Sequence, residues 1–443
     1  MPAEPSDDRL TRAYRGTLLH CVAAPPDDDP WSAIETVPDG LLVVEDGRIA
    51  GRGSWEALAP TLDPAVEIVD YRGCLLSPGF IDSHVHYVQT DIIASFGSQL
   101  LDWLERFTFP AEQAFADPAV AADTAAFFLR ELWRNGTTTA VVFGSVHKGS
   151  VDALFSAALE AGMRLVAGKV MMDRHCPEAL ADTPATGYED SAALIEAWHG
   201  RGRLAYAVTP RFAATSSPEQ LARAAGLLQE YDGLYMQTHV AENRAEVAWI
   251  AELFPEARSY LDVYERAGLL NERAVLAHCI YLDDDDRHLM AERGSAASFC
   301  PTSNLFLGSG LFDIPAADSA GMAFALGSDV GGGTSFSMLA TQQAAYGIAQ
   351  LGGYALHPAR AWYLATLGGA RALRLDHAVG NFETGKDADF IVLDPAATPL
   401  LARRCAAAGD AMERLFAMII LGDDRAVRAT YVAGHCVHDR DDD

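Results

Sequence analysis

The chain has 443 residues, of which 50% are hydrophobic and 21% are charged, a balance typical of a globular protein and not of a disordered one. Its formal net charge of −28 disfavours nucleic acid as a partner, because the phosphate backbone is also negative. The negative charge also fits adaptation to high salt or a codon bias toward Ala, Arg and Asp, and the sequence favours neither explanation.

No stretch approaches the roughly 20 consecutive apolar residues of a membrane-spanning helix. The N-terminal residues lack the order of a signal peptide, in which a basic segment precedes an apolar one. The seven cysteines are widely spaced and odd in number, which is typical of free thiols in a reducing compartment. We therefore expect a cytoplasmic protein without a membrane partner.

The first part of the chain is predicted to be mostly β-structure. Residues 1–12 are expected to form a disordered leader. The dipeptide Asp46-Gly47 lies between two β-rich arms and favours a type I′ hairpin turn. The strand candidates are 14–22, the two arms within 41–50, and 66–70. Residues 1–74 are therefore predicted to belong to a β domain.

From residue 75 onward, short apolar runs of strand length alternate with longer segments of helical periodicity. The strand candidates are 75–86, 137–144, 164–172, 204–212, 234–243, 274–282, 296–303 and 324–329. Between them lie good helices, such as 118–135, which follows an Asp117 N-cap. Eight strand–helix repeats favour an α/β fold with a (β/α)₈ TIM-type barrel over residues 75–375.

After residue 375 the pattern returns to β-structure, with strand candidates at 387–394, 426–431 and 432–438. Both ends of the chain are thus rich in strands, whereas the middle alternates strands with helices. The simplest arrangement pairs residues 376–443 with the N-terminal segment. We expect the two pieces to form one small composite β-sandwich beside the barrel.

The first strand candidate of the barrel ends in His84-Val-His86. Side chains two residues apart on a strand point to the same face, and their Cα atoms lie about 6.6 Å apart. This spacing suits two imidazoles that bind one metal ion. Two unrelated histidines in a core strand remain an equally good reading of this pair alone.

Other polar residues fall where later strand candidates end. His239 and Glu242 end the fifth strand, His278 ends the sixth, and Asp329 ends the eighth. Function in such barrels gathers at the carboxyl ends of the strands. A helix cap for Asp329 or a surface acid at Glu242 would explain each residue singly, but their coincidence favours a metal site. Nitrogen and oxygen donors without thiolate favour Zn²⁺, with Fe²⁺ or Mn²⁺ as alternatives.

The motifs Pro-Gly-Phe-Ile-Asp-x-His-x-His, Thr-His-x-x-Glu, Ala-His-Cys and Gly-Ser-Asp resemble those of the amidohydrolase superfamily of metal-dependent barrel hydrolases. Four longer stretches resemble more closely the members of that superfamily that act on guanine. These stretches are 100–112, 209–212, 299–310 and 329–336. The resemblance implies hydrolytic deamination of this purine base to xanthine and ammonia, one zinc ion per chain, and a homodimer.

The same resemblance implies roles for individual residues. The implied metal ligands are His84, His86, His239, His278 and Asp329. Metal-activated water would attack the ring carbon, Glu242 and Asp329 would move protons, and His278 would bind the metal or hydrogen-bond the water. The fourth strand lacks the lysine that bridges two ions in many relatives, which favours a single metal. Lys169, on the third strand, is expected to be a packed cation.

Substrate contacts are also implied by the resemblance. They are His86, Gln89, Arg211, Phe212, His239, Glu242 and Asp329. Gln89 offers a donor and an acceptor to the purine edge, Arg211 can donate to a carbonyl oxygen, and Phe212 can wall the ring. A structural salt bridge is the open alternative for Arg211. For Trp103, packing is favoured over substrate contact.

Three other functions remain as alternatives. A sister aminohydrolase acting on a pterin, 8-oxoguanine or a triazine would share the metal set and differ at Gln89, Arg211 and the loop 97–112. A ring-opening hydrolase of cyclic amides commonly uses two metals, and the missing fourth-strand lysine argues against it. A catalytically inactive barrel that serves as a scaffold is disfavoured, because the donor set and Glu242 are all present.

Overall fold

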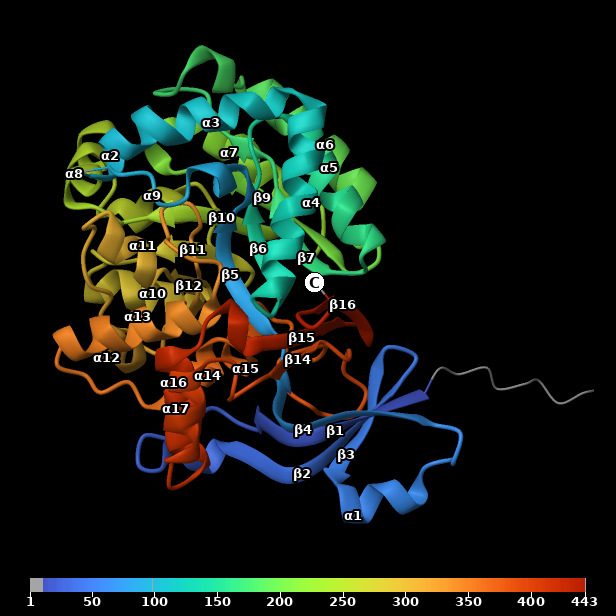
Figure 1. Ribbon diagram of the computed structural model, residues 1–443. Helices are drawn as coiled ribbons and strands as arrows, with labels where there is room; N and C mark the ends of the chain where they lie inside the picture. Colours follow the sequence, from blue (N-terminus) through green and yellow to red (C-terminus); the bar gives the residue numbers. More distant parts are fainter. Residues whose placement is uncertain (1–10, 98, 443) are drawn as a thin grey trace, which may run out of the picture.

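A computed structural model describes residues 11–97 and 99–442 and shows a barrel beside a smaller β-sheet module (Figure 1). Most of the predicted leader, residues 1–10, lies outside the described residues. The prediction that disorder extends to residue 12 is wrong, because Thr11 and Arg12 begin the first strand. There the Arg12 side chain donates a hydrogen bond to Glu67, 2.9 Å away.

Eight parallel strands of the described chain form the barrel in sequence order, and a two-residue strand, β8, pairs beside β9. The strands are β5 (Phe80–His86), β6 (Thr137–Phe143), β7 (Arg164–Gly168), β8 (Val170–Met171), β9 (Leu204–Pro210), β10 (Tyr235–Val240), β11 (Ala274–His278), β12 (Ala296–Phe299) and β13 (Ala323–Leu326). Two backbone hydrogen bonds join the first strand to the segment after the last. Asp329 N–H donates to His84 O, and His86 N–H donates to Val330 O, each at 2.8 Å. The predicted (β/α)₈ barrel is confirmed.

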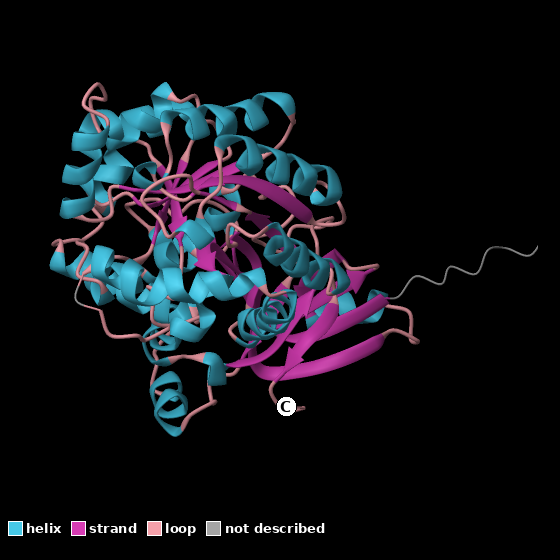
Figure 2. Cartoon of the chain, turned by 90° about the horizontal axis from the view of Figure 1, so that it is seen from above, coloured by secondary structure: helices cyan, strands magenta, loops and turns pink. Residues whose placement is uncertain are grey.

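Helices surround the barrel strands, as Figure 2 shows. They are α2 (Leu100–Trp103), α3 (Phe109–Gln113), α4 (Pro118–Arg134), α5 (Lys148–Glu160), α6 (Pro184–Trp198), α7 (Pro218–Glu230), α8 (Arg244–Leu253), α9 (Tyr260–Arg266), α10 (Asp284–Arg293), α11 (Pro301–Phe306), α12 (Ile314–Ser319), α13 (Met338–Leu351), α14 (Pro358–Leu364) and α15 (Leu367–Ala372). The predicted N-cap of α4 is confirmed, since the Asp117 carboxylate accepts a hydrogen bond from Ala119 N. Within the described ranges, no helix is long and apolar enough to cross a membrane.

The smaller module is a seven-stranded mixed sheet built from both ends of the chain, in the order β16-β15-β14-β4-β1-β2-β3. Its strands are β1 (Thr11–Cys21), β2 (Ile34–Glu45), β3 (Arg48–Ser54), β4 (Glu67–Pro78), β14 (Phe390–Leu393), β15 (Val427–Val432) and β16 (His435–Asp439), with the short helix α1 (Trp55–Leu58) after β3. Strand β4 joins the two ends, because it pairs with β1 on one side and β14 on the other. The rings of Tyr14, Phe390 and Tyr431 pack together in its core. The expected joining of the N- and C-terminal pieces of the β-sandwich domain is confirmed, and their strands form a single mixed sheet.

The predicted strand 75–86 is in fact two strands, which is a correction. Residues 75–78 end β4 in the smaller sheet, and β5 of the barrel starts at Phe80. Gly79 lies between them, and a Cβ atom there would be only 2.1 Å from Thr138 Oγ1. The close approach explains why the chain passes between the modules at a glycine. The domain boundaries predicted at 74 and 375 stay predictions.

Two helices interrupt the C-terminal part of the chain, α16 (Pro399–Ala406) and α17 (Ala411–Leu421). The strand candidates predicted for residues 376–443 lie on either side of these helices, which were not predicted. Both helices begin at side-chain caps, Thr398 and Asp410. Leu415, Met418 and Ile419 are buried, a spacing that places all three on one helix face.

A buried ion network ties the base of the barrel to the sheet module. Arg203, just before β9, donates to Asp389 at 2.8 Å and to Asp387 at 3.1 Å. Arg164, at the start of β7, donates to Asp387 at 2.7 Å. The side chains of both arginines are only 15% exposed, and that of Asp389 is 2% exposed. Removal of one partner would therefore leave an uncompensated buried charge.

Replacing Arg203 with Met is expected to lower the free energy of unfolding by about 3 kcal/mol, because Asp389 would lose its cation. Urea denaturation followed by circular dichroism measures this change. The matched control is Arg403→Met on α16, where the arginine is exposed. The control should change stability by less than about 0.5 kcal/mol. Equal small losses in both variants would contradict a stabilising role for the network.

Candidate active site

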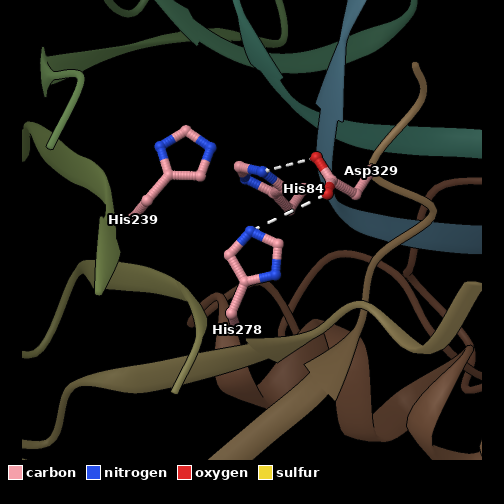
Figure 3. Close-up of side chains that lie close together, drawn as sticks. All are labelled: His84, His239, His278 and Asp329. Atoms are coloured by element: carbon pink, nitrogen blue, oxygen red, sulfur yellow. Dashed lines mark ion pairs between the residues drawn. The ribbon is translucent and has the colours of Figure 1, made fainter. Parts of the chain in front are cut away.

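Four donor side chains converge at the carboxyl ends of four barrel strands. His84 lies on β5, His239 on β10, His278 at the end of β11, and Asp329 just after β13. Figure 3 shows the three imidazoles and the carboxylate pointing toward one another. One donor atom from each lies within 4.8 Å of the others. The structure thus brings together residues that are separated along most of the chain.

His86 lies against this cluster as well. Its Nε2 atom is 3.2 Å from His84 Nε2, 3.2 Å from His239 Nε2 and 3.3 Å from Asp329 Oδ1, and His84 Nε2 is 3.1 Å from the same Asp329 oxygen. Donors held tetrahedrally at 2.0–2.1 Å from one ion are about 3.3 Å apart. The distances among His84, His86, His239 and Asp329 therefore fit a single metal ion.

The histidines are held in the form that binds metal. Burial lowers the pKa of His86 to about 3 and that of His239 well below its ordinary value, so both rings are neutral. His239 Nδ1 is 2.7 Å from Arg211 O, which can only accept, so Nδ1 carries the proton and Nε2 keeps its lone pair. His278 Nδ1 similarly lies 3.0 Å from Asn304 Oδ1.

Asp82 holds the backbone at His84 and next to Asp329 in place. Its fully buried carboxylate accepts hydrogen bonds from His84 N at 3.2 Å and Ser328 N at 3.0 Å. It therefore links the first strand of the barrel to the segment that carries Asp329. Burial raises the pKa of Asp82 to about 6, against these hydrogen bonds.

Backbone strain collects around the cluster. Ala241, His278, Cys279 and Asp329 all have φ between 51° and 72°, in the left-handed region that non-glycine residues rarely adopt. Such strain persists only where the surrounding structure imposes it, and it concentrates at functional sites. The carboxyl ends of β10, β11 and β13 are therefore shaped to aim side chains at one point.

The two acids beside the histidines have opposite pKa shifts. Burial alone would raise the pKa of Asp329, but hydrogen bonds with His84 and His86 and the electrostatic influence of His84 and His278 hold it well below its ordinary value. Burial and the nearby Asp329 charge raise the pKa of Glu242 to about 8. Near neutral pH, Asp329 is therefore a carboxylate, whereas Glu242 carries a proton that it can donate.

Glu242 is held on both sides. Its Oε1 accepts a hydrogen bond from Ser309 Oγ at 2.9 Å, and its Oε2 lies 3.3 Å from His278 Nε2. Its backbone N–H donates to the buried carboxylate of Glu246 at 2.9 Å. Glu246, Ser309 and Asn304 are supporting residues that the sequence did not single out. A capping-box spacing from Asn243 to Glu246 was the available signal.

A cavity adjoins the cluster. Its lining includes His86, Gln89, Trp103, Arg211, Phe212, His239, Glu242, His278 and Asp329. The structure thus brings every predicted substrate contact to one cavity. Trp103 is buried as expected, with Nε1 donating to Ser95 O at 3.2 Å, and it also lines the cavity.

Glu112, which contacts two of the lining residues, is the main residue around this pocket that the sequence did not predict. Its fully buried carboxylate accepts hydrogen bonds from Arg211 Nη1 at 2.8 and 2.9 Å and from Gln89 Nε2 at 3.1 Å. Arg211 therefore forms the buried salt bridge that was the alternative to substrate contact, and it also lines the cavity. Lys169 is fully buried in an ion pair with Asp182, so the expectation of a packed cation is confirmed.

Comparison with known proteins places this architecture in a family. The family model described as the amidohydrolase family matches residues 75–437. The chain belongs to the amidohydrolase family. The resemblance read from the motifs is thereby confirmed. The family is metal-dependent, in agreement with the donor cluster of this amidohydrolase.

Individual relatives resemble this amidohydrolase over nearly its whole length. Guanine deaminase of Escherichia coli is 46% identical over 98% of this chain and 99% of its own. The solved E. coli guanine deaminase structure covers 97% of this chain and 100% of its own, with a TM-score of 0.95. A structure of guanine deaminase from C. acetobutylicum with bound guanine in the active site is 29% identical. It covers 97% of this chain and 100% of its own, with a TM-score of 0.87.

Proposed function

We propose that this amidohydrolase converts guanine and water to xanthine and ammonia. The main support is the similarity to guanine deaminases over the full length of the chain. In addition, Gln89 and Arg211 line the same cavity as residues of the cluster that could hold a metal ion. The sister aminohydrolases remain the competing functions, because they would share the donor cluster.

The proposed metal is one Zn²⁺ ion per chain, with Fe²⁺ or Mn²⁺ as alternatives. His84, His86, His239 and Asp329 would hold it, and His278 would serve as a further ligand or as a hydrogen-bond partner of the attacking water. When bound, such an ion lowers the pKa of a water molecule from 15.7 to about 7, which supplies a nucleophile at neutral pH. The spacing of the donor atoms supports this assignment.

The remaining steps fall to the side chains around the cavity. Asp329, whose pKa is held low, would take the proton of the attacking water. Glu242, with its pKa raised to about 8, would protonate a ring nitrogen. It would then regain a proton that comes from the attacking water and pass it to the departing ammonia. In the recognition step, Arg211 would donate to the purine carbonyl and Phe212 would pack against the ring.

Ammonia release from a panel of amines tests the proposed function. The panel contains guanine, adenine, cytosine, 8-oxoguanine, a pterin and an aminotriazine, with metal analysis of the same sample. We expect guanine to give the highest kcat/KM and the protein to hold about one metal ion per chain. A higher kcat/KM for the pterin, 8-oxoguanine or the triazine would replace the proposal by the corresponding sister activity.

Replacing Arg211 with Met is expected to raise KM for guanine by roughly 10- to 100-fold, because a charged hydrogen-bond donor to the substrate is lost. Metal content should not change. The control is Arg244→Met, since Arg244 is exposed at the start of α8. Parallel loss of metal and of guanine binding would make Arg211 a purely structural residue.

The proposal also includes a homodimer in the cytoplasm. The homodimer follows from the family resemblance. The location follows from the widely spaced cysteines, and similarity to bacterial guanine deaminases supports it. The division into residues 1–74, 75–375 and 376–443 is likewise proposed as the domain organisation, with the barrel as the catalytic domain.

A further inference from the structure

Two residues that line the cavity, Gln89 and Arg211, are joined through a third side chain, Glu112, which accepts hydrogen bonds from both. Gln89, Glu112 and Arg211 come from the segments after β5, on α3 and after β9, and each is at most 2% exposed. We infer that Glu112 is a positioning residue that sets the hydrogen-bonding pattern that Gln89 and Arg211 present to the substrate. This inference rests on the proposed function and adds a residue to its recognition machinery.

The orientation of the Gln89 amide follows from its two partners. Gln89 Nε2 lies 3.1 Å from the Glu112 carboxylate, which only accepts when ionised. Gln89 Oε1 lies 3.3 Å from Gly331 N, which only donates. The amide therefore has one orientation, with its nitrogen toward Glu112. One N–H and one lone pair of Gln89 remain for a ligand.

Arg211 is fixed by the same carboxylate. Nη1 donates to both oxygens of Glu112. Within the described part of the chain, the guanidinium forms no other hydrogen bond. The planar guanidinium holds its other donors in a rigid fork once one nitrogen is anchored. The ring of Phe109 lies beneath it, with the guanidinium carbon 5.7 Å from the ring centroid.

Glu112 belongs to the segment that also supplies the apolar wall. Leu100, Trp103 and Leu104 line the cavity, and a π-helical turn (Leu104–Thr108) joins α2 to α3 before Glu112. Figure 1 shows α2 and α3 at the top of the barrel. A charge buried this deeply is retained only with partners, so its contacts to Gln89 and Arg211 determine where it lies.

The resulting pattern predicts which ring edge is recognised. Gln89 presents a donor next to an acceptor, and Arg211 adds a second donor. Their complement is an edge in which a carbonyl lies beside a ring N–H. Guanine and hypoxanthine both have such an edge, whereas unsubstituted purine lacks it. Hypoxanthine also lacks the amino group that would be removed, so its binding can be measured without turnover.

The decisive substitution is Glu112→Gln. Glutamine has the same shape, but its NH₂ group must face an Arg211 donor at one oxygen position, or the donors of both Arg211 and Gln89 at the other. In either case the negative charge that anchors the two donors is lost. The ratio of hypoxanthine to purine affinity, measured by calorimetry on the metal-loaded protein, should fall at least 10-fold. KM for guanine should rise more than kcat falls, with metal content unchanged.

A carboxylate elsewhere that is paired with a buried cation provides the control. Asp182→Asn breaks the pair with Lys169, and Asp182 is not part of the cavity lining. This control should lower the melting temperature without changing the affinity ratio. An unchanged ratio in folded Glu112→Gln, or an equal fall in Asp182→Asn, would overturn the inference.

A second variant covers the case in which Glu112→Gln does not fold. Glu112→Asp keeps the charge but shortens the side chain by one methylene, so it cannot hold both partners at their present distances. Its affinity ratio should fall at least 3-fold, and an unchanged ratio would again overturn the inference. Failure of the proposed function looks different, because the unmodified protein would then release no ammonia from guanine.

Discussion

Replacing Glu242 with Gln is expected to lower kcat for guanine at least about 100-fold while the protein keeps its metal. Glutamine can accept the hydrogen bond from Ser309 but has no carboxyl proton to transfer. Because the pKa of Glu242 is raised to about 8, the wild-type carboxyl is mainly protonated at neutral pH and ready to donate. Steady-state ammonia release and metal analysis on the same preparations measure both quantities.

The control for this experiment is Glu252→Gln. Glu252 is exposed on α8, the helix that follows the Glu242 loop, so its substitution should leave turnover within about twofold. Near-normal activity of Glu242→Gln would remove its role as proton donor. Loss of metal from that variant would instead make Glu242 part of the metal-holding structure.

Removing the metal with a chelator is expected to abolish ammonia release, and addition of Zn²⁺ should restore it. The physical reason lies in the donor cluster, where His86 Nε2 lies 3.2 Å from His84 Nε2 and 3.2 Å from His239 Nε2. Neutral imidazole lone pairs at that distance repel unless a cation lies between them. The melting temperature should therefore fall on chelation and recover with metal.

Two histidine variants separate the cluster from the rest of the protein. His239→Ala should abolish metal binding, whereas His199→Ala, at a half-buried histidine outside the cluster, should leave metal content and activity unchanged. Activity that persists in chelator, in a sample shown to be free of metal, would rule out the proposed mechanism.

The barrel could be predicted from the sequence because its strands are buried on both faces and read as continuous apolar runs. Thr137–Phe143 is an example, since every residue in it is buried and its last four residues, Ala-Val-Val-Phe, are apolar. The donor residues could be predicted for a related reason. The barrel topology places all carboxyl ends of strands at one face, so His84, His239, His278 and Asp329 had to be neighbours.

Other features depend on contacts that no local pattern contains. The break at Gly79 comes from the approach of Thr138, which is distant in the sequence. Glu112 resembles any acid near a helix end, and only the fold shows that Arg211 and Gln89 surround it. The helices α16 and α17 did have local signals, namely caps and helical spacing, but they lie in a segment dominated by strands.

The seam that closes the barrel has a consequence for the order in which the molecule can be assembled. His84 and Asp329 lie on either side of it, joined through the backbone hydrogen bond from Asp329 N to His84 O. A nascent chain therefore has no complete metal site until the last barrel strand has emerged and docked against the first. The sheet module is completed even later, because β4 pairs with β14, which follows the barrel in the sequence. Metal loading should thus be a late event that locks in a chain already almost fully synthesised.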